Sequence, residues 1–293
     1  MKKIFIQLAN QVYMNNKIFM NMDINKLNAG WFELRRQLSD MGYEATTADN
    51  NDLSDCEGIV FFNADSIYAP TSLSEKIKNA LRMIFGIQTS RNNLSRDLYK
   101  EAVQAGLKDK MVLVLWEPPA ICKLNFKKET WNKFNKILTW NDELLKMEKF
   151  KRFYIPMEGN ETLKEAVPFD KKKLLVNVSF NKYSNYRKAL YAARRRTIAY
   201  FTANFPNDFD LYGLRWNIPV TRLQIMFPWF VKKYSTYKGK TENKLQTLSR
   251  YKFNLCYENT YGTKGYICDK IFTSFHARSV PIYWGASNVE EYI

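Results

Sequence analysis

Short apolar runs alternate with helix-like stretches along most of this chain, which limits the folds open to it. In the first half, the apolar runs are residues 3–9, 43–49, 56–65 and 108–119, and the amphipathic stretches are 28–42 and 72–86. The stretch 28–42 places Trp31, Leu34, Leu38 and Met41 on one face, and Gly42 can end that helix. Strands alternating with helices predict βαβ units and a mostly parallel sheet.

The same alternation returns in the second half after a polar, charged segment at 157–173. Strands are predicted at 174–180, 209–213, 252–259 and 279–285, and helices at 185–205 and 269–278. The first of these helices turns Leu190, Ile198, Phe201 and Phe205 inward. With 293 residues, two domains are expected. We therefore predict an α/β protein of two Rossmann-like domains, 1–160 and 161–293, facing each other across a cleft.

The charge of the chain favours polyanionic partners. Lys and Arg number 45 against 29 Asp and Glu, a net charge of +16, which attracts nucleic acid, nucleotide diphosphates or an anionic membrane surface. No apolar run approaches the roughly 18 residues of a membrane-spanning helix. The start MKKIFIQLANQ turns polar too soon for a signal peptide. The prediction is a cytoplasmic protein that can contact the inner membrane peripherally.

Cysteine and histidine usage argues against several kinds of site. The four cysteines lack CxxC spacing, so buried reduced thiols are predicted rather than disulfides or a zinc site. His276 is the single histidine, which argues against a His-ligated metal and against Ser-His-Asp chemistry. No acidic DxD dyad stands in the context of a metal-nucleotide site. We predict no metal site.

Ligands of open α/β sheets bind beyond the carboxyl ends of strands, and Glu117 stands at such an end. It follows the apolar run MVLVLW directly, where Pro118 and Pro119 force the chain out of the sheet. Partial desolvation beside Trp116 would raise the pKa of this carboxyl toward that of a general base. The alternative is an ordinary solvated glutamate at a strand end.

Two further segments carry cations at such positions. The arginines of the 194–196 run could meet a diphosphate, although such a run is also typical of a solvated helix face. In the segment CYENTYGTKGYICDK (256–270), Gly262 and Gly265 permit tight turns before a helix that begins near Asp269 and Lys270. Lysine at a helix start is unfavourable by up to ~1 kcal/mol, so an anionic partner such as phosphate is predicted. The alternative is a capping Asp269 beside a solvated Lys270.

The segment 251–293 resembles the signature of the inverting alpha-1,3/4-fucosyltransferases of glycosyltransferase family 10, in their bacterial branch. The family pattern runs KF, apolar residues, FEN, a loop, a Tyr-Ile/Val-Thr-Glu-Lys run, a helix and a VP strand. LWEPP with ILTWND, and RRRTIAYF with FDLYG, resemble that branch too. Two motifs depart from it: Tyr257-Glu258-Asn259 replaces FEN, and Cys268-Asp269-Lys270 replaces Thr-Glu-Lys, which shortens one carboxylate by a methylene.

The resemblance implies a GT-B fold in which domain 1–160 binds the acceptor and domain 161–293, either truncated at its C-terminus or unusually short for the family, binds GDP-fucose. Lys270 and Arg195, with Arg194 as second choice, would neutralise the diphosphate. Asn259, Tyr266 and Asp269 would line the donor pocket, with Glu258 supporting the loop. Glu117 would be the base. GDP-fucose would be a substrate, with no tightly bound cofactor and no required divalent metal.

The implied activity is transfer of L-fucose to a GlcNAc or Glc unit by a single inverting displacement. The acceptor would be an N-acetyllactosamine-like or lipid-linked glycan, with products of the Lewis-antigen type in lipopolysaccharide O-antigen, other surface glycans or protein glycosylation. This interpretation has no nucleic-acid partner. Two alternatives stay open: a basic nucleic-acid-binding protein, favoured by the charge and by aromatic residues among Lys and Arg, and a GT-B transferase for another GDP sugar.

Overall fold

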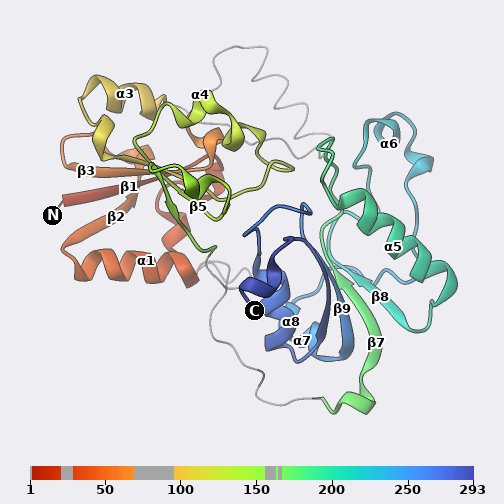
Figure 1. The fold of residues 1–293 in the computed structure, drawn as a ribbon. Helices are drawn as coiled ribbons and strands as arrows, with labels where there is room; N and C mark the ends of the chain where they lie inside the picture. The colour runs from red at the N-terminus through yellow and green to blue at the C-terminus, as the bar shows by residue number, and fades with distance from the viewer. Residues whose placement is uncertain (1, 21–28, 69–95, 156–162, 164–166) are drawn as a thin grey trace. The chain divides into compact units, whose positions relative to one another are not determined.

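The computed structural model describes residues 2–20, 29–68, 96–155, 163 and 167–293 (Figure 1). The chain divides into two compact units, Met1–Gly159 and Asn160–Ile293. Each unit contains one parallel sheet, as the alternation of strands and helices predicts. The division lies one residue from the predicted domain boundary.

The first unit contains a six-stranded sheet in the order β2-β1-β3-β4-β5-β6, with every neighbouring pair parallel. Its strands are β1 (Lys2–Leu8), β2 (Tyr43–Thr47), β3 (Cys56–Phe62), β4 (Met111–Leu115), β5 (Lys136–Thr139) and β6 (Phe150–Arg152). Its described helices are α1 (Ala29–Asp40), α3 (Leu98–Gln104) and α4 (Lys128–Trp131).

Successive residues of these strands enter different cores because side chains alternate across a sheet. Phe5 and Leu113 belong to the core that includes Leu98 of α3, while Ile6 and Val114 belong to the core against which α1 packs. The sheet is therefore covered on both faces, which is why its strands read as continuous apolar runs.

Two sequence predictions for this unit need comment. Helix α1 packs Trp31, Leu34 and Leu38 against the core as predicted. Met41 is 68% exposed, so its predicted inward position is wrong: α1 ends at Asp40, and Met41 lies beyond the last helical turn. Gly42 follows with φ +85°, the left-handed conformation that glycine adopts readily. The helix predicted at 72–86 lies outside the described residues.

The second unit has a four-stranded parallel sheet in the order β10-β9-β7-β8. Its strands are β7 (Lys173–Val178), β8 (Phe209–Tyr212), β9 (Tyr251–Tyr257) and β10 (Val280–Trp284). Its helices are α5 (Tyr191–Asn204), α6 (Arg222–Met226), α7 (Lys244–Ser249) and α8 (Asp269–His276).

Helices pack on this second sheet according to the same alternation. Leu175 of β7 shares a core with Ile198 of α5, whereas Val176 shares another with Leu248 of α7. The predicted helix 185–205 begins only at Tyr191. Phe205 is 42% exposed, so its predicted inward position is also wrong, because α5 ends at Asn204 and Phe205 leaves the inward stripe.

Three expectations about sites and spans can be compared with the described residues. All four cysteines are free and buried, which confirms the predicted reduced thiols. Within the described ranges, no helix has the length and apolar character needed to span a bilayer. Those same ranges contain no group of three or more His, Cys, Asp or Glu side chains arranged to hold a metal ion.

Candidate functional site

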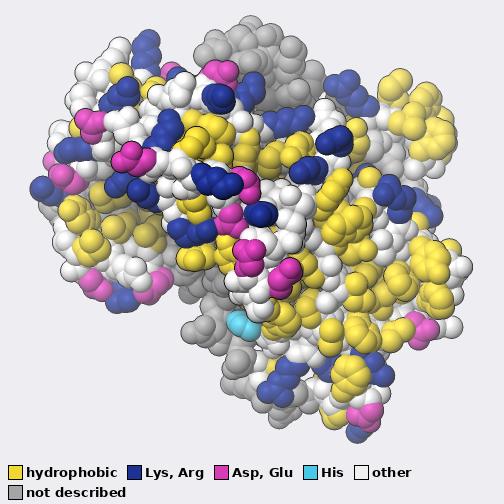
Figure 2. Space-filling view, in the orientation of Figure 1, with side chains coloured by type: hydrophobic (Ala, Val, Ile, Leu, Met, Phe, Trp, Pro, Cys, Tyr) yellow, Lys and Arg dark blue, Asp and Glu magenta, His cyan; other side chains and the backbone are white. Residues whose placement is uncertain are grey.

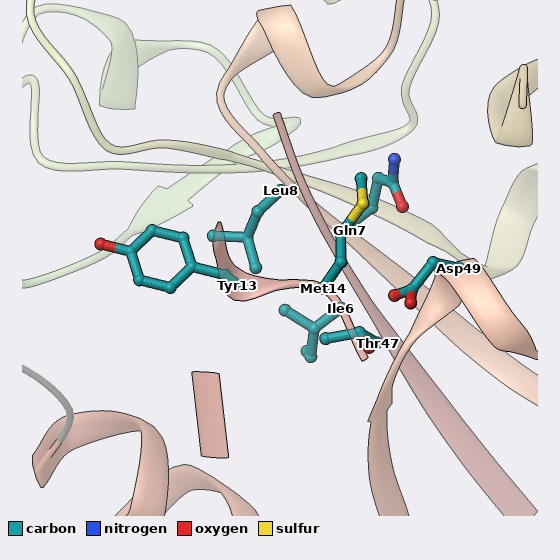
Figure 3. Close-up of a pocket in the computed structure, with 7 residues that line it drawn as sticks. All are labelled: Ile6, Gln7, Leu8, Tyr13, Met14, Thr47 and Asp49. Atoms are coloured by element: carbon teal, nitrogen blue, oxygen red, sulfur yellow. The ribbon is translucent and has the colours of Figure 1, made fainter. Parts of the chain in front are cut away.

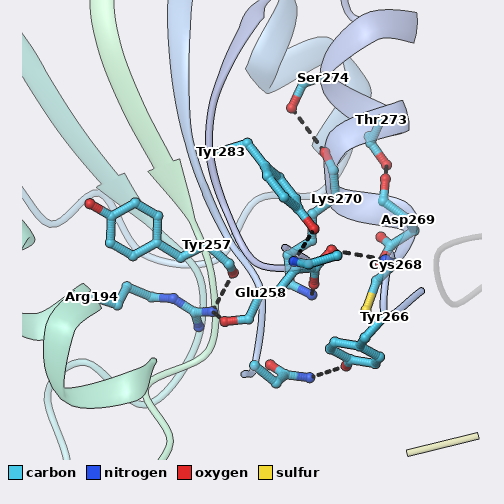
Figure 4. A network of polar contacts seen from close by, with 12 residues as sticks. Arg194, Tyr257, Glu258, Tyr266, Cys268, Asp269, Lys270, Thr273, Ser274 and Tyr283 are labelled. Atoms are coloured by element: carbon cyan, nitrogen blue, oxygen red, sulfur yellow. Dashed lines mark hydrogen bonds and ion pairs between the residues drawn. The ribbon is translucent and has the colours of Figure 1, made fainter. Parts of the chain in front are cut away.

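Glu258 lies directly after β9, and its side chain is fully buried. One carboxylate oxygen, Oε1, accepts a hydrogen bond from the backbone N–H of Cys268 at 2.8 Å, and Oε2 accepts one from Nζ of Lys270 at 2.7 Å (Figure 4). Cys268 immediately precedes α8. The Glu258 carboxylate therefore connects the end of β9, an inner strand, to the start of the helix that follows it.

Lys270, in the first turn of α8, has its anionic partner inside the protein. Burial disfavours its ammonium form and would lower its pKa. The interactions with Cys268, Glu258 and Asp269 outweigh this effect and raise the pKa of Lys270 well above its ordinary value. The side chain is 23% exposed, and Glu258 takes one of its three N–H donors. The Lys270 ammonium is thus fixed in place with further donors to offer.

Asp269 connects α8 to α7. Its carboxylate lies 2.7 Å from Nζ of Lys244. Burial raises the pKa of Asp269, but Lys244 and Lys270 outweigh this and lower it overall. Aspartate, one methylene shorter than the glutamate of the family signature, is therefore long enough to connect the two helices. No observation tests its predicted contact with a donor sugar.

The loop between β9 and α8 is held by polar contacts from several segments. Nδ2 of Asn259 donates to Oη of the buried Tyr266 at 3.0 Å. Gly262 and Gly265 have φ of +66° and +79°, which confirms the tight turns predicted there. A Cβ at Gly285, after β10, would lie 2.5 Å from Cγ of Glu258, so this glycine lets the strand end pass beside the buried carboxylate.

The three arginines of α5 lie in different surroundings. Arg194 is 4% exposed, and its Nη2 donates to the carbonyl oxygens of Tyr257 at 2.6 Å and Glu258 at 3.1 Å (Figure 4). Nη1 of Arg195 donates instead to the carbonyl oxygen of Lys182 at 2.5 Å. Burial lowers the pKa of both arginines, and Arg196 is exposed. The structure thus groups Arg194, and not Arg195, with Glu258 and Lys270.

Glu117 occupies a strand end in the first unit, two residues after β4. Its backbone N–H donates to Oδ1 of Asn63 at 2.7 Å, and its carbonyl oxygen accepts from Nδ2 of Asn125 at 2.8 Å. Its side chain is half-buried. The predicted base is thus held by its backbone in a defined position at the carboxyl edge of the sheet.

Asp65 lies near Glu117 and is missing from the sequence prediction. It follows β3 in a short 3-10 turn, Ala64–Ser66. Burial chiefly, with a contribution from the negative charge of Glu117, raises the pKa of Asp65 to about 6. The reasoning that selected Glu117, an acid just beyond an apolar strand, applies equally to the Asn-Ala-Asp that follows IVFF and could have found it.

A shallow hollow lies at the same edge of the first sheet, beyond β1 and β2 (Figure 3). Its lining includes Gln7, Tyr13 and Asp49, and the Tyr13 ring lies at the opposite end from the Asp49 carboxylate. An aromatic ring with amide and carboxylate groups is a combination that suits hydroxyl-rich ligands.

Residues 220–293 match the family model described as glycosyltransferase family 10 (fucosyltransferase), C-terminal. The likeness to glycosyltransferase family 10 thus covers about the last quarter of the chain. The family 10 segment contains β9, α8 and β10, and so the whole Glu258, Asp269 and Lys270 group. Arg194 and Glu117 lie outside it.

Curated proteins that are similar to this chain match it over short stretches. An alpha-(1,3)-fucosyltransferase, FucT, of Helicobacter pylori is 50% identical over 48 residues, which is 16% of this chain and 10% of that protein. An alpha-(1,4)-fucosyltransferase of Arabidopsis thaliana is 46% identical over 46 residues, 16% of this chain and 11% of that protein. The matched stretch spans about a tenth of each relative's length.

Solved structures extend the likeness of the fold to nearly the whole chain. An alpha1,3-fucosyltransferase crystallised with GDP-fucose aligns at a TM-score of 0.50 and 16% identity, over 99% of this chain and 70% of that one. A DNA-modifying beta-glucosyltransferase aligns at 0.50 and 13% identity, over 97% and 79%. With two Rossmann-like units, the fold class of this chain is GT-B, as predicted.

Proposed function

We propose that this protein is an alpha-1,3(/4)-fucosyltransferase that moves L-fucose from GDP-fucose to a GlcNAc or Glc unit of a glycan. The observation that carries the proposal is the buried Glu258–Lys270 ion pair at the carboxyl end of β9, inside the segment that matches family 10. Nucleotides bind at such strand ends in open α/β sheets. The fucosyltransferase activity of the similar curated protein and the GDP-fucose of the similar solved structure support the choice of donor.

The donor diphosphate is assigned to the cationic side of this group. Lys270 keeps N–H donors beyond the one that Glu258 takes, and the guanidinium of Arg194 lies at the adjacent backbone of Tyr257 and Glu258. The two carboxylates at this place, Glu258 and Asp269, do not cancel the three cations Arg194, Lys244 and Lys270. Fixed cations beside the leaving diphosphate stabilise the charge that develops as it departs. Arg195 stays a predicted contact.

The proposed reaction is a single inverting displacement. Glu117 removes the proton of an acceptor hydroxyl, that oxygen forms a bond to C1 of fucose, and the bond from C1 to the diphosphate oxygen breaks as GDP leaves. One base and a stabilised leaving group suffice, unlike the paired carboxylates of a retaining glycosidase. We propose that no protein-bound metal takes part, so EDTA should leave the transfer rate unchanged.

The direct test is a transfer assay with GDP-fucose and N-acetyllactosamine. We expect fucosylated product with inverted stereochemistry at C1, and NMR of the product distinguishes 1,3 from 1,4 linkage. GDP-mannose serves as the matched donor control. Turnover of GDP-mannose but not GDP-fucose would replace the proposal with a transferase for another GDP sugar. Filter binding of RNA or DNA at physiological salt without any transfer would favour the nucleic-acid alternative.

The substitution Glu117→Gln tests the assignment of the base. We expect kcat to fall by about 10²- to 10⁴-fold, because a general base typically contributes that much. Affinity for GDP-fucose should persist, since Glu117 and the Glu258 group lie in different units of the chain. Calorimetry and initial rates measure the two effects. A variant that transfers fucose near the wild-type rate would place the base elsewhere.

We further propose a cytoplasmic enzyme that acts at the inner membrane on a lipid-linked acceptor, within the synthesis of lipopolysaccharide O-antigen or another surface glycan. An apolar surface around α6 supports membrane contact (Figure 2). We define this α6 patch by its exposed side chains Leu223, Met226, Trp229 and Phe230. Lys232 and Lys233 follow it directly, a pairing of apolar and basic groups that suits an anionic bilayer surface.

Vesicle sedimentation tests the role of the α6 patch. The wild-type protein should bind phosphatidylcholine vesicles that contain phosphatidylglycerol more strongly than pure phosphatidylcholine vesicles. The double variant Trp229→Ser/Phe230→Ser should lose most of this binding. Tyr154→Ser is the matched control, since Tyr154 is an aromatic residue of the other unit that is 69% exposed. Equal binding by the double variant and the wild type would remove the patch from membrane contact.

A further inference from the structure

Asp65 and Glu117 stand at equivalent places beyond two neighbouring parallel strands. In the register of β3 and β4, Phe62 pairs with Val114. Asp65 and Glu117 each lie three residues beyond that pair. Both acids therefore follow the carboxyl ends of adjacent parallel strands, at one edge of the sheet. The negative charge of Glu117 contributes to the raised pKa of Asp65, as this proximity requires.

A pair of asparagines fixes the backbone that carries both acids. Asn125 is fully buried; it accepts from the N–H of Ala64 at 2.7 Å and donates to Oδ1 of Asn63 and to the carbonyl oxygen of Glu117, each at 2.8 Å. Asn63 has φ +64° and ψ 154°, a conformation that side-chain-bearing residues rarely adopt. The strain at Asn63 and the buried amide of Asn125 together hold the two acid-bearing segments in place.

The carboxyl group of Asp65 lacks the compensation usual for a buried acid. Its Oδ1 is buried and has no hydrogen-bond partner within the described part of the chain. Besides burial, the described groups that act on Asp65 are its own backbone and Glu117. Burial chiefly, with a contribution from the charge of Asp65, raises the pKa of the nearby Cys122 thiol to about 12. Among the described residues, no cation is found to act on the pKa of Asp65. Buried polar groups without partners are uncommon and concentrate at functional sites.

We propose that Asp65 is a positioning residue of the transfer reaction, whose negative charge favours proton uptake by Glu117 from the acceptor hydroxyl. The inference rests on the proposed function, because it assumes that Glu117 is the base. While both groups are ionised they repel each other, and this repulsion ends when Glu117 takes the proton. Asp65 itself gains and loses no atom: the proton moves from the acceptor oxygen to Glu117.

The proposal predicts a definite direction of pH dependence. Asp65 is ionised above about pH 6 and protonated below it, so its assistance is present at neutral pH and fades as the pH falls. Replacing Asp65 by a neutral isostere removes the repulsion at every pH. Glu117 is then a weaker base once ionised, and the fall in rate near pH 6 that protonation of Asp65 causes is absent.

The substitution Asp65→Asn tests this inference in the full-length protein with GDP-fucose and N-acetyllactosamine. We expect kcat to fall about three- to tenfold, since the strength of a general base sets its efficiency, and the acidic limb of the pH profile to move to lower pH. KM for GDP-fucose should not change. Asp55→Asn, at an aspartate whose side chain is 64% exposed, should match the wild type. An unmoved acidic limb would overturn the proposal.

Two further measurements keep the test decisive if Asp65→Asn folds poorly. Asp65→Glu retains the negative charge, so the acidic limb of its pH profile should stay at the wild-type position. If that limb moves as far as in Asp65→Asn, the charge of Asp65 has no role. Carboxyl ¹³C NMR of the wild type should show coupled titration of Asp65 and Glu117, and independent titration would overturn the inference. Absence of fucosyl transfer by the wild type would instead overturn the proposed function, because the NMR coupling does not depend on activity.

Discussion

At the scale of single residues, the anionic partner that the sequence predicts for Lys270 is a side chain of the protein itself. A lysine in the first turn of a helix opposes the helix dipole, and from sequence this predicts an anionic partner. The structure supplies one, the carboxylate of Glu258 at 2.7 Å. The helix position of Lys270 is therefore explained inside the protein, and its role toward GDP rests on the donors it has left.

Lys270→Ala should affect both stability and donor binding. Removing one partner of a buried pair leaves the Glu258 carboxylate uncompensated, so the free energy of unfolding should fall by about 2–4 kcal/mol. Affinity for GDP should fall about ten- to a hundredfold, as expected for one lost charge-assisted hydrogen bond. Urea unfolding and calorimetry measure these effects, with the exposed Lys264→Ala as control. Unchanged GDP affinity would remove Lys270 from the diphosphate site.

At the scale of elements, Asp210 links three strands of the second sheet. It is a buried residue of β8 whose Oδ2 accepts from Nζ of Lys173 in β7 at 2.7 Å and from Oη of Tyr251 in β9 at 2.6 Å. Burial raises the pKa of this carboxyl, but the bonds from Lys173 and Tyr251 outweigh it and the folded-state pKa lies below its ordinary value. The ionised form therefore stabilises the sheet that carries the Glu258 group.

Because of the Asp210 carboxylate, the free energy of unfolding should decrease as the pH falls into the acidic range. Because the folded-state pKa is lowered, the stabilisation is complete above the unfolded-state value of about 4 and is lost as the pH falls through the folded-state value. Asp210→Asn should lower the free energy of unfolding by about 1–3 kcal/mol at pH 7, and by less at pH 3. Urea titrations at both pH values test this, with the exposed Asp208→Asn as control. An equal loss at both values would contradict the linkage.

At the scale of the whole molecule, the chain consists of two units with separate cores. The apolar clusters around Phe61 and Phe62 belong to the first unit, and those around Phe209 and Val176 belong to the second. Each unit joins a parallel sheet to its own helices. Cooperative unfolding is a property of such compact units rather than of the chain length.

Scanning calorimetry should therefore resolve two unfolding transitions, and GDP should raise the midpoint of only one. A ligand at about a hundred times its Kd stabilises the unit that binds it by about 2.7 kcal/mol. Lys270→Ala, which alters the second unit, identifies the GDP-sensitive transition, and Glu117→Gln is the matched variant of the first unit. A rise in the transition that belongs to residues 1–159 would contradict a donor site in the second unit.

Much of the architecture could be predicted from local pattern. Apolar runs such as CEGIVFF and MVLVL became β3 and β4, because a strand covered on both faces must be apolar along its length. The errors fall at ends: Met41 and Phe205 continue an apolar stripe beyond the last helical turn. Strands β5 and β6, of four and three residues, are too short for a periodic signal.

The candidate site, too, was predictable from the sequence only in part. Lys270, Asp269 and Asn259 could be found in the sequence because a strand, a glycine-containing loop and a helix start stand in order, with a family signature over them. That Arg194 meets Glu258, and Asp65 meets Glu117, could not be predicted, because the members of each pair are more than 50 residues apart. Chain order states which residues follow a strand. Only the lateral pairing of strands decides which strand ends are neighbours, and with them which charges meet.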